Sequence, residues 1–302
     1  FQTRMIIIYF KSKINTILKM RLYFLVVSFF SGLALSDCFE SIDSSRTVIA
    51  GGSLTEITYF LEKEDKLIAV DITSNYPEET KNLASIGYVR ALSTEGLLSL
   101  SPTLIIGEDD MGPPLVIDQL GVTGVDVRIV PEEQTIEGII EKIRCLSSIL
   151  GVSKSSQDQK ISLLNKDVNK LSLLVAKNLK SPKRVMLILN MQGTSPIVAG
   201  QGTSGDSFIK MTGSENVASS FEGWKPVNAE AIISYDPDYI VITERGMGSF
   251  ADIESLANDP SLKFTSAAKN KNILTEDGMA MLGFGVRTIT SALKFSEIFS
   301  KE

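Results

Sequence analysis

Residues 86–107 read IGYVRALSTEGLLSLSPTLIIG, and they show how the whole chain is built. The spacing predicts a short amphipathic helix whose leucines at positions 97, 98 and 100 lie on its buried side. Pro102 ends this helix, because proline cannot continue the hydrogen-bond ladder. The apolar run Leu104–Ile106 then suits a strand that is buried on both faces of a sheet. A helix followed directly by such a strand indicates an α/β fold.

The same alternation covers residues 46–153, which we predict to form an N-terminal α/β lobe. Strands separated by helical segments of about ten residues imply parallel pairing with right-handed crossovers. The predicted strands are 47–50, 67–70, 104–106 and 125–130. The predicted helices are 56–61, capped by Ser53 or Thr55, then 115–120 and 136–150.

A single long helix is predicted after Gly151, from about Ser155 to Leu179, within a segment 154–180 that spans between lobes. Its apolar residues recur at helical spacing, and 25 residues would extend roughly 37 Å. An ordinary surface helix of one large domain is the alternative. The absence of a predicted strand between Val130 and Val185 favours the spanning helix.

Residues 181–302 are predicted to form a second α/β lobe. Glu230–Ile242 echoes Glu95–Ile106, since each segment reads as Glu, a short apolar helix, a proline and a buried strand. The predicted fold is therefore α/β, with two similar lobes of mainly parallel sheets joined by one spanning helix. The strands expected here are 184–190, 197–199, 239–243 and 273–274, and the helices are 206–211, 229–235 and 287–300.

Composition excludes several function classes. The 302 residues carry a formal net charge of −6 and no histidine. A mildly acidic chain without basic clusters is not expected to bind nucleic acid. Without histidine, His-dependent catalytic triads, zincin motifs and most Zn or Mn transport sites are excluded.

The N-terminal segment is typical of a secretory signal. Basic residues precede an apolar run, 22–35, that is shorter than the roughly 20 residues of a membrane span. Residues 34–36 offer a small-x-small cleavage site, so residues 1–36 are interpreted as a signal peptide with translated residues upstream of a start at Met5 or Met20. An uncleaved anchor is the alternative. A lipoprotein signal at Cys38 is disfavoured by Asp37, and we expect a soluble, exported, periplasmic protein.

Cys38 and Cys145 are the two cysteines of the chain. Export would permit a disulfide between them. Cys145 lies on the apolar side of the predicted helix 136–150, however, and a buried free thiol is the favoured interpretation.

Six motifs follow one another along the chain: AGGSLTE (50–56), DITSNYP (71–77), GYVRALSTEG (87–96), AGQGT (199–203), WKPVNAEA (224–231) and LGFGVRT (282–288). In this order they resemble the haem-binding branch of the periplasmic substrate-binding proteins that feed ABC importers. The last motif departs from the family's pattern at Val286, where proline is usual. The resemblance implies a binding protein rather than an enzyme, with a hinge that bends little when ligand binds.

In that family the tyrosine of the Gly-Tyr-x-Arg motif is an axial ligand of haem iron, and this role carries over to Tyr88. Ferric iron prefers an anionic oxygen, but a free phenol has a pKa of about 10. Arg90, two residues on, would favour the phenolate. Tyrosinate is a known haem ligand.

The expected cleft is apolar, to bury the porphyrin faces. Its candidate lining residues are Tyr76, Met191, Trp224, Met247 and Phe284, with Arg90 and Lys81 near the ligand's anionic groups. Some relatives add a histidine after the strand that corresponds to residues 185–189, but the chain reads Asn190-Met191-Gln192 there. Met191 could coordinate through sulfur, although an apolar contact is favoured. We expect a single axial ligand.

The partners implied are haem, the importer's permease and its ATPase, and we expect a monomer. Binding proteins of this type present an acidic residue on each lobe to the permease. Glu230 matches the position on the second lobe. On the first lobe Glu108 is the candidate, with Asp109 and Asp110 as alternatives.

Two other functions remain open. The same fold could carry an iron-siderophore or a corrinoid. A nucleotide-binding enzyme is the distant alternative, because residues 200–205 match G-x-G-x-x-G and Glu222 lies near the spacing of a ribose-binding acid. That match comes from a short polar turn, and the first predicted strand–helix unit lacks it.

Overall fold

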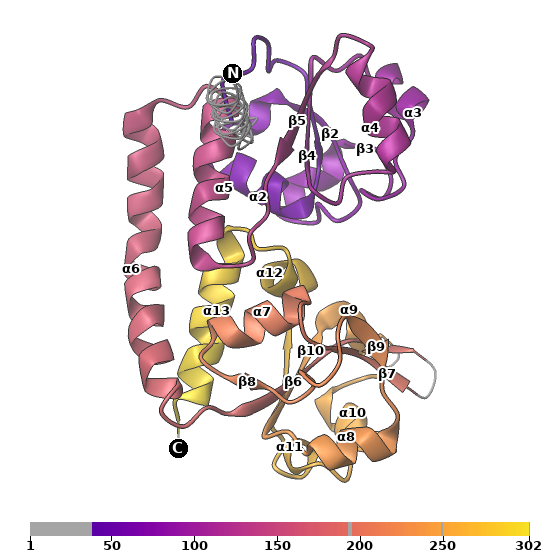
Figure 1. Ribbon diagram of the computed structural model, residues 1–302, viewed down its shortest axis with the longest axis vertical. Coiled ribbons are helices and arrows are strands. Elements are labelled where there is room, and N and C mark those ends of the chain that lie inside the picture. Colours follow the sequence, from indigo (N-terminus) through magenta and orange to yellow (C-terminus); the bar gives the residue numbers. More distant parts are fainter. Residues whose placement is uncertain (1–37, 193–194, 249, 302) are drawn as a thin grey trace, which may run out of the picture. The chain divides into compact units, whose positions relative to one another are not determined.

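The computed structural model describes residues 38–192, 195–248 and 250–301, which contain two β-sheets with their helices (Figure 1). The predicted α/β architecture of two lobes and a long connecting helix is confirmed. The predicted signal peptide lies outside the described residues. Among the helices that are described, none is both long and apolar enough to cross a membrane.

The first sheet has the strand order β3-β2-β1-β4-β5, and all of its pairs are parallel, as predicted. Helices follow the strands and cover the sheet, so β1 is buried along its whole length. The strands are β1 (Thr47–Ala50), β2 (Leu67–Val70), β3 (Ala84–Ser85), β4 (Leu104–Glu108) and β5 (Asp126–Val130). The helices are α2 (Gly52–Phe60), α3 (Thr94–Ser99), α4 (Pro114–Gly121) and α5 (Ile136–Ile149), with 3-10 turns η1 (Glu64–Lys66) and η2 (Glu78–Asn82).

The second sheet is mixed rather than purely parallel. Its order is β11-β10-β6-β7-β9, with β8 paired to β6. β7 is antiparallel to both β6 and β9. For β6 and β7 the reason is the short link between them, which is too short for the crossover that a parallel pair needs. The strands are β6 (Arg184–Gln192), β7 (Ser195–Ala199), β8 (Glu215–Asn216), β9 (Trp224–Pro226), β10 (Tyr239–Thr243) and β11 (Ile273–Glu276). The helices are α7 (Ser204–Met211), α8 (Ala229–Tyr235), α9 (Glu244–Met247), α10 (Ile253–Ala257), α11 (Ser266–Lys269), α12 (Gly278–Leu282) and α13 (Val286–Phe299).

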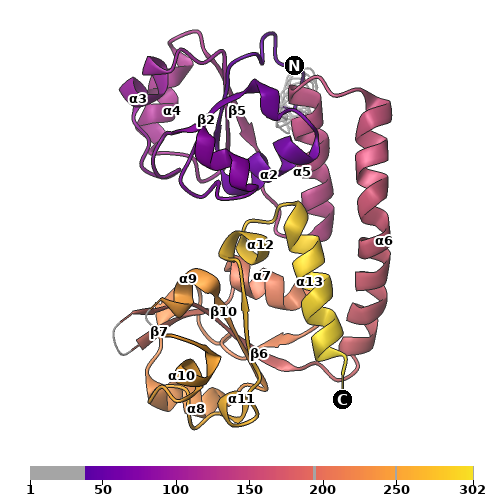
Figure 2. The same ribbon diagram turned by 180° about the vertical axis from the view of Figure 1, so that it is seen from behind.

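The long helix α6 (Lys154–Asn178) connects the two sheets and lies within one residue of its predicted bounds. The C-terminal helix α13 runs beside it, as the opposite views in Figures 1 and 2 both show. Near their ends the side-chain amide of Asn178 donates to the carbonyl oxygen of Ser296, with an Nδ2–O distance of 3.1 Å. The two helices α6 and α13 therefore run side by side between the lobes.

An ion pair ties α13 to the first lobe. Arg287, in the first turn of α13, donates through Nε to Oε1 of Glu56 on α2 at 3.0 Å. Glu56 is buried, and burial raises the pKa of its carboxyl, while the hydrogen bond from Arg287 opposes that rise. The ring of Tyr76 stacks on the same guanidinium, whose Cζ lies 4.0 Å from the ring centroid.

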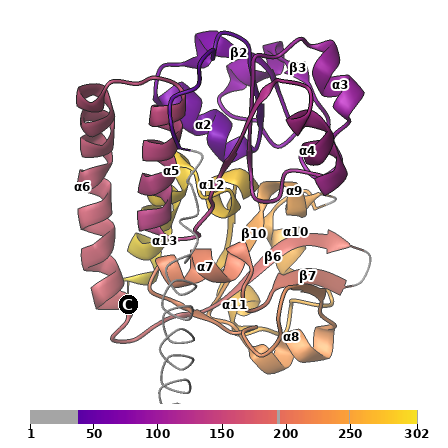
Figure 3. The same ribbon diagram turned by 45° about the horizontal axis from the view of Figure 1, so that its top comes forward.

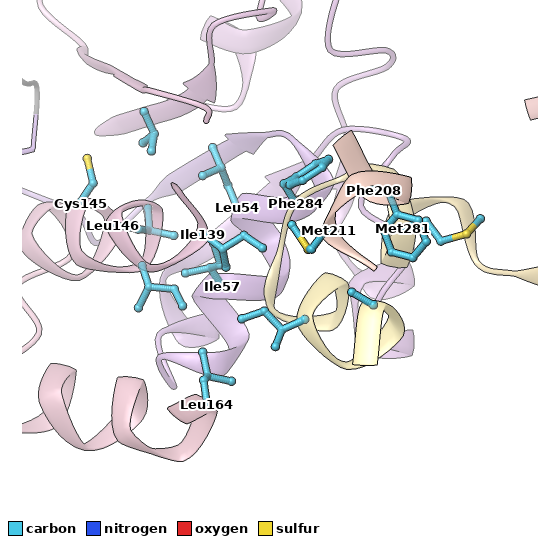
Figure 4. Packing of buried hydrophobic residues seen from close by; sticks show 14 of the residues in the cluster. Leu54, Ile57, Ile139, Cys145, Leu146, Leu164, Phe208, Met211, Met281 and Phe284 are labelled. Carbon is cyan, nitrogen blue, oxygen red and sulfur yellow. The ribbon is translucent and has the colours of Figure 1, made fainter. Parts of the chain in front are cut away.

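Figure 3 shows α5, α6 and α13 along the same side of the molecule. A continuous hydrophobic cluster passes from the helices of the first lobe through α6 and α13 to those of the second (Figure 4). Phe284 belongs to this cluster and is fully buried in it. The prediction that Phe284 lines the ligand cleft is therefore wrong for this structure. An aromatic ring in a loop next to a core is stabilised more by complete burial than by partial exposure to a cleft.

Cys38 and Cys145 form a disulfide, so the expectation of free thiols is wrong. Cys145 is buried in the core cluster as predicted, but burial does not prevent pairing when a second cysteine packs on the same site. The segment after Cys38 runs along α5, where the backbone N–H of Ser41 donates to the carbonyl of Ile149 at 3.0 Å. This places the two Cα atoms 4.6 Å apart, within the range that a disulfide allows.

Candidate functional site

A cavity of about 290 Å³ lies where both lobes contribute residues. It is built at the carboxyl ends of strands, which is where open parallel sheets place their ligand sites. The first lobe contributes Gly51, Gly52, Thr73, Tyr88, Val89, Arg90, Glu108, Asp110, Glu132 and Gln134, and the second contributes Leu189, Ser204, Trp224, Met279, Leu282 and Gly283. We call this cavity the cleft pocket.

The start of α2 forms the floor of the cleft pocket on the first lobe. The helix begins at Gly52 rather than at the predicted Glu56, because partners from the loop after β2 satisfy its first backbone N–H groups. Asp71 accepts from the N–H of Gly51 and Thr73 accepts from that of Gly52, both at 3.0 Å. A Cβ on Gly52 would lie 2.6 Å from the carbonyl oxygen of Thr73, so this close approach needs glycine.

Tyr88 lies on the wall of the cleft pocket, in the turn after β3, and is 41% exposed. Backbone hydrogen bonds fix its segment: Gly87 accepts from the N–H of Ile72 at 2.9 Å and Val89 accepts from that of Gly112 at 3.0 Å. The turn is thus anchored to two neighbouring loops, and the phenol is presented to the cleft by a rigid backbone. Such an accessible phenol can bind a metal centre of an entering ligand.

Arg90 also lines the cleft pocket, but its charge is already shared. Its Nε and one terminal nitrogen lie 2.9 and 2.8 Å from the same carboxylate oxygen of Asp110. The hydrogen bond that Arg90 donates to Asp110 raises the pKa of Arg90, so the guanidinium stays charged. More than half of this side chain is exposed, which leaves donors free for an anionic ligand group.

Behind these residues the first lobe holds a buried ionic cluster. Lys142 of α5 is fully buried and pairs with Glu108, which also accepts from the hydroxyl of Ser53. Glu132, in the loop after β5, lies 3.8 Å from the same ammonium. Burial raises the pKa of the Glu132 carboxyl to about 7, and the neighbouring Glu108 adds to this effect while Lys142 opposes it.

Within the described ranges, no group of three or more Cys, Asp or Glu side chains is placed so that it could hold a metal ion. Glu108 is buried and paired with Lys142, so the prediction that it docks to a permease is wrong.

Trp224 is the predicted second-lobe residue that lines the cleft pocket. It begins β9 and is half-buried against the core. Met279 and Leu282 of α12 line the pocket beside it, although neither was predicted. Both residues follow the final strand, β11, closely in the sequence. Because the carboxyl ends of the strands face the cleft, this position could have predicted them.

The other predicted lining residues lie elsewhere. Met191 and Met247 pack against the second core cluster and do not line the cleft pocket. Tyr76 is exposed and lies over Arg287 instead. Lys81 pairs at the surface with Glu78, its neighbour in η2, at 3.0 Å.

The two exposed acidic residues of the internal echo have matching positions. Glu230 lies in the first turn of α8, whose cap is Asn228, and Glu95 lies in the first turn of α3, whose cap is Ser93. Each helix precedes a strand that pairs in parallel with the first strand of its sheet. Glu95, not Glu108, is therefore the first-lobe counterpart of Glu230.

A second cavity, of about 490 Å³, lies between the start of α5, α6 and α7. Although larger, it has no aromatic residue in its lining, and its one cation, Lys210, is paired with Asp206 at 2.7 Å. The cleft pocket combines a phenol, an indole and several charges. It is therefore the better candidate for the functional site.

This fold and this site define a two-lobed binding protein, and the comparisons agree. A family model described as periplasmic binding protein matches residues 48–278, so the chain belongs to that family. Its members and its structural neighbours are substrate-binding transport proteins.

Curated relatives include the ABC transporter substrate-binding lipoprotein YvrC of Bacillus subtilis, 26% identical over 194 residues, which are 64% of this chain and 61% of YvrC. A vitamin B12-binding protein of Yersinia pestis is 27% identical over 202 residues, 66% of this chain and 70% of that protein. The matched stretch thus falls short of two thirds of the YvrC chain.

Solved structures match more of the chain. The periplasmic haem-binding protein HutB of Vibrio cholerae is 33% identical with a TM-score of 0.74, covering 85% of this chain and 99% of HutB. The haem-binding protein RhuT of Roseiflexus sp. RS-1 is 29% identical with a TM-score of 0.76, covering 85% and 98%. BhuT, a periplasmic haem-binding protein solved with two haems, is 30% identical with a TM-score of 0.75, covering 84% and 97%.

Proposed function

We propose that this protein is exported, captures haem in the cleft pocket and delivers it to the permease of an ABC importer. The observation that carries the proposal is the phenol of Tyr88, exposed on the wall of the pocket and held there by a fixed turn. The haem-binding structural neighbours support the same ligand class.

The rest of the pocket suits a porphyrin. Trp224, Met279 and Leu282 offer apolar surface on the side of the pocket that the second lobe contributes, and burying porphyrin against it would contribute about 25 cal/mol per Å². Arg90 can donate to a carboxylate of the ligand. At about 290 Å³ the pocket is at the lower end of ligand sites, so we expect part of the porphyrin to extend toward the exposed side chain of Ile72, beside the Tyr88 turn.

We expect Tyr88 to be the single protein ligand of the iron. The chain contains no histidine, and Met191 is half-buried against the second core cluster. Tyrosinate is a hard anionic donor, which suits ferric iron.

A corrinoid is the second candidate, because curated relatives include vitamin B12-binding proteins. An aromatic, partly apolar pocket could hold either ring system. The two ligands would contact Tyr88 differently. Ferric haem has an open coordination site that can bind the phenol oxygen, whereas a corrinoid would only pack against the phenol ring.

Trp224 provides the test, since it is the single tryptophan of the chain and lines the cleft pocket. Hemin added to the protein is expected to quench its fluorescence and to give a Soret band with the visible charge-transfer feature of a ferric phenolate. Cyanocobalamin and a ferric siderophore are the comparisons. Quenching by cyanocobalamin but not by hemin would replace haem with a corrinoid as the proposed ligand.

We propose that Glu95 and Glu230 together dock the protein on arginines of the permease. Both are exposed first-turn carboxylates on helices of matching position, one on each lobe. Charge pairs at such an interface guide partner choice and association more than they stabilise either protein alone.

Glu95→Arg and Glu230→Arg are each expected to abolish stimulation of the permease-bound ATPase while leaving hemin binding unchanged, because like charges would then face each other. The measurement is ATP hydrolysis by the reconstituted importer with and without the loaded protein. Glu137→Arg is the matched control, since Glu137 is an exposed first-turn residue of α5 outside the echo. If Glu95→Arg or Glu230→Arg stimulates ATP hydrolysis as well as wild type does, that residue is not part of the docking surface.

A further inference from the structure

The wall that the first lobe contributes to the cleft pocket carries an excess of negative charge. Glu108 and Glu132 share one ammonium, that of Lys142, and Asp110 is paired with Arg90. Asp109 adds a further carboxylate, which accepts from the backbone N–H of Glu132 at 3.2 Å. Four carboxylates therefore face two cations around this part of the pocket.

The second lobe does not balance this charge. The residues that it contributes to the lining are Leu189, Ser204, Trp224, Met279, Leu282 and Gly283, and all are uncharged. The closer partner of Lys142 is Glu108, which pairs with it directly, while Glu132 lies 3.8 Å away. Of the two carboxylates that share Lys142, Glu132 is thus the less compensated, and it lines the space that a ligand would fill.

We propose that Glu132 takes up a proton when the pocket fills, so that capture of haem is linked to pH. This inference rests on the proposed function, since its direction follows from the chemistry of haem. The ligand replaces water beside Glu132 with an apolar ring and carries two carboxylates of its own. Both changes disfavour a charged carboxylate at this position.

The sign of the pH dependence follows. Burial and Glu108 already raise the pKa of Glu132 to about 7 in the free protein, and the ligand would raise it further. Below pH 7 the carboxyl is mostly protonated in both states, so affinity does not depend on it. Above pH 7 binding must take up a proton, and affinity falls by as much as about tenfold per pH unit, the limit for one proton.

The experiment measures the hemin dissociation constant from quenching of Trp224 between pH 6.5 and 8.5. Relative to wild type, Glu132→Gln is expected to bind up to about tenfold more tightly for each pH unit above 7, because glutamine keeps the shape without the charge. Glu133→Gln, at an exposed neighbouring carboxylate, is expected to follow wild type. A ratio that does not change with pH overturns the inference.

A second readout separates this inference from the proposed function. Carbon-13 NMR of the Glu132 carboxyl follows its titration directly, without and with hemin. We expect a midpoint near 7 in the free protein and a higher one in the complex. A midpoint below 5 in the free protein overturns the inference whatever the ligand is, whereas failure of hemin to bind at any pH overturns the haem function instead.

Discussion

Tyr88→Phe is expected to abolish the visible charge-transfer band of the hemin-loaded protein while the fold is retained. Phenylalanine keeps the ring and its packing but removes the oxygen that would bind iron. Affinity for hemin should fall by at least about tenfold, because an iron–oxygen bond is worth no less than a charged hydrogen bond. The measurements are the absorption spectrum and the dissociation constant at one pH.

Tyr76→Phe is the control for this substitution. Tyr76 is also an exposed tyrosine of the first lobe, but its ring lies over Arg287 and does not line the cleft pocket. Its variant should keep the wild-type spectrum. The assignment of Tyr88 is contradicted if Tyr88→Phe keeps the charge-transfer band, and loss of the band in Tyr76→Phe would move the iron ligand to Tyr76.

Lys142→Met is expected to lower the free energy of unfolding by about 3–5 kcal/mol, the typical loss when one partner of a buried ion pair is removed. Lys142 is fully buried, and Glu108 would be left beside Glu132 without a cation. Urea unfolding with linear extrapolation measures the change.

Two further variants test the cause of that loss. The double variant Lys142→Met/Glu108→Met should recover much of the stability, because apolar residues can replace a buried pair at little cost. Lys154→Met breaks an exposed pair with Asp158 and should cost less than about 1 kcal/mol. A single-variant loss as small as that of Lys154→Met would mean that Glu108 finds another partner or a proton.

Periodicity in the sequence was sufficient for the longer elements of the fold. The stripe of apolar residues predicted helix 155–179, and the structure has α6 at Lys154–Asn178. The pieces that could not be predicted are two- or three-residue strands such as β3, β8 and β9. Such short strands have no pattern of their own, because they exist only through pairing with residues far away in the sequence.

The candidate site was predictable only in part, and the reason is burial. The resemblance directed attention to Tyr88, Arg90 and Trp224, which line the cleft pocket. Phe284 belongs to one of the same motifs but is buried in the core. An apolar residue near a strand end can pack inward or face a cleft, and its identity alone does not decide between the two.

Contacts between residues that are distant in the sequence also could not be predicted. Glu108 follows an apolar strand and looks like a surface acid until Lys142, in a helix 34 residues later, is placed against it. Glu132 likewise lies in a polar loop sequence, and its pKa is raised by burial and by Glu108, which belongs to another strand. Neither contact leaves a signal at short range in the chain.

The pairing of α6 with α13 has a mechanical consequence. A single rod between two bodies resists bending but lets them turn about its long axis. Here α13 lies beside α6, and its first turn is fastened to α2 through Arg287 and Glu56. Twisting one lobe against the other would have to shear the two helices and break a buried ion pair. Torsion is thus the stiff direction, and any opening of the cleft should be a flexing across the helix pair.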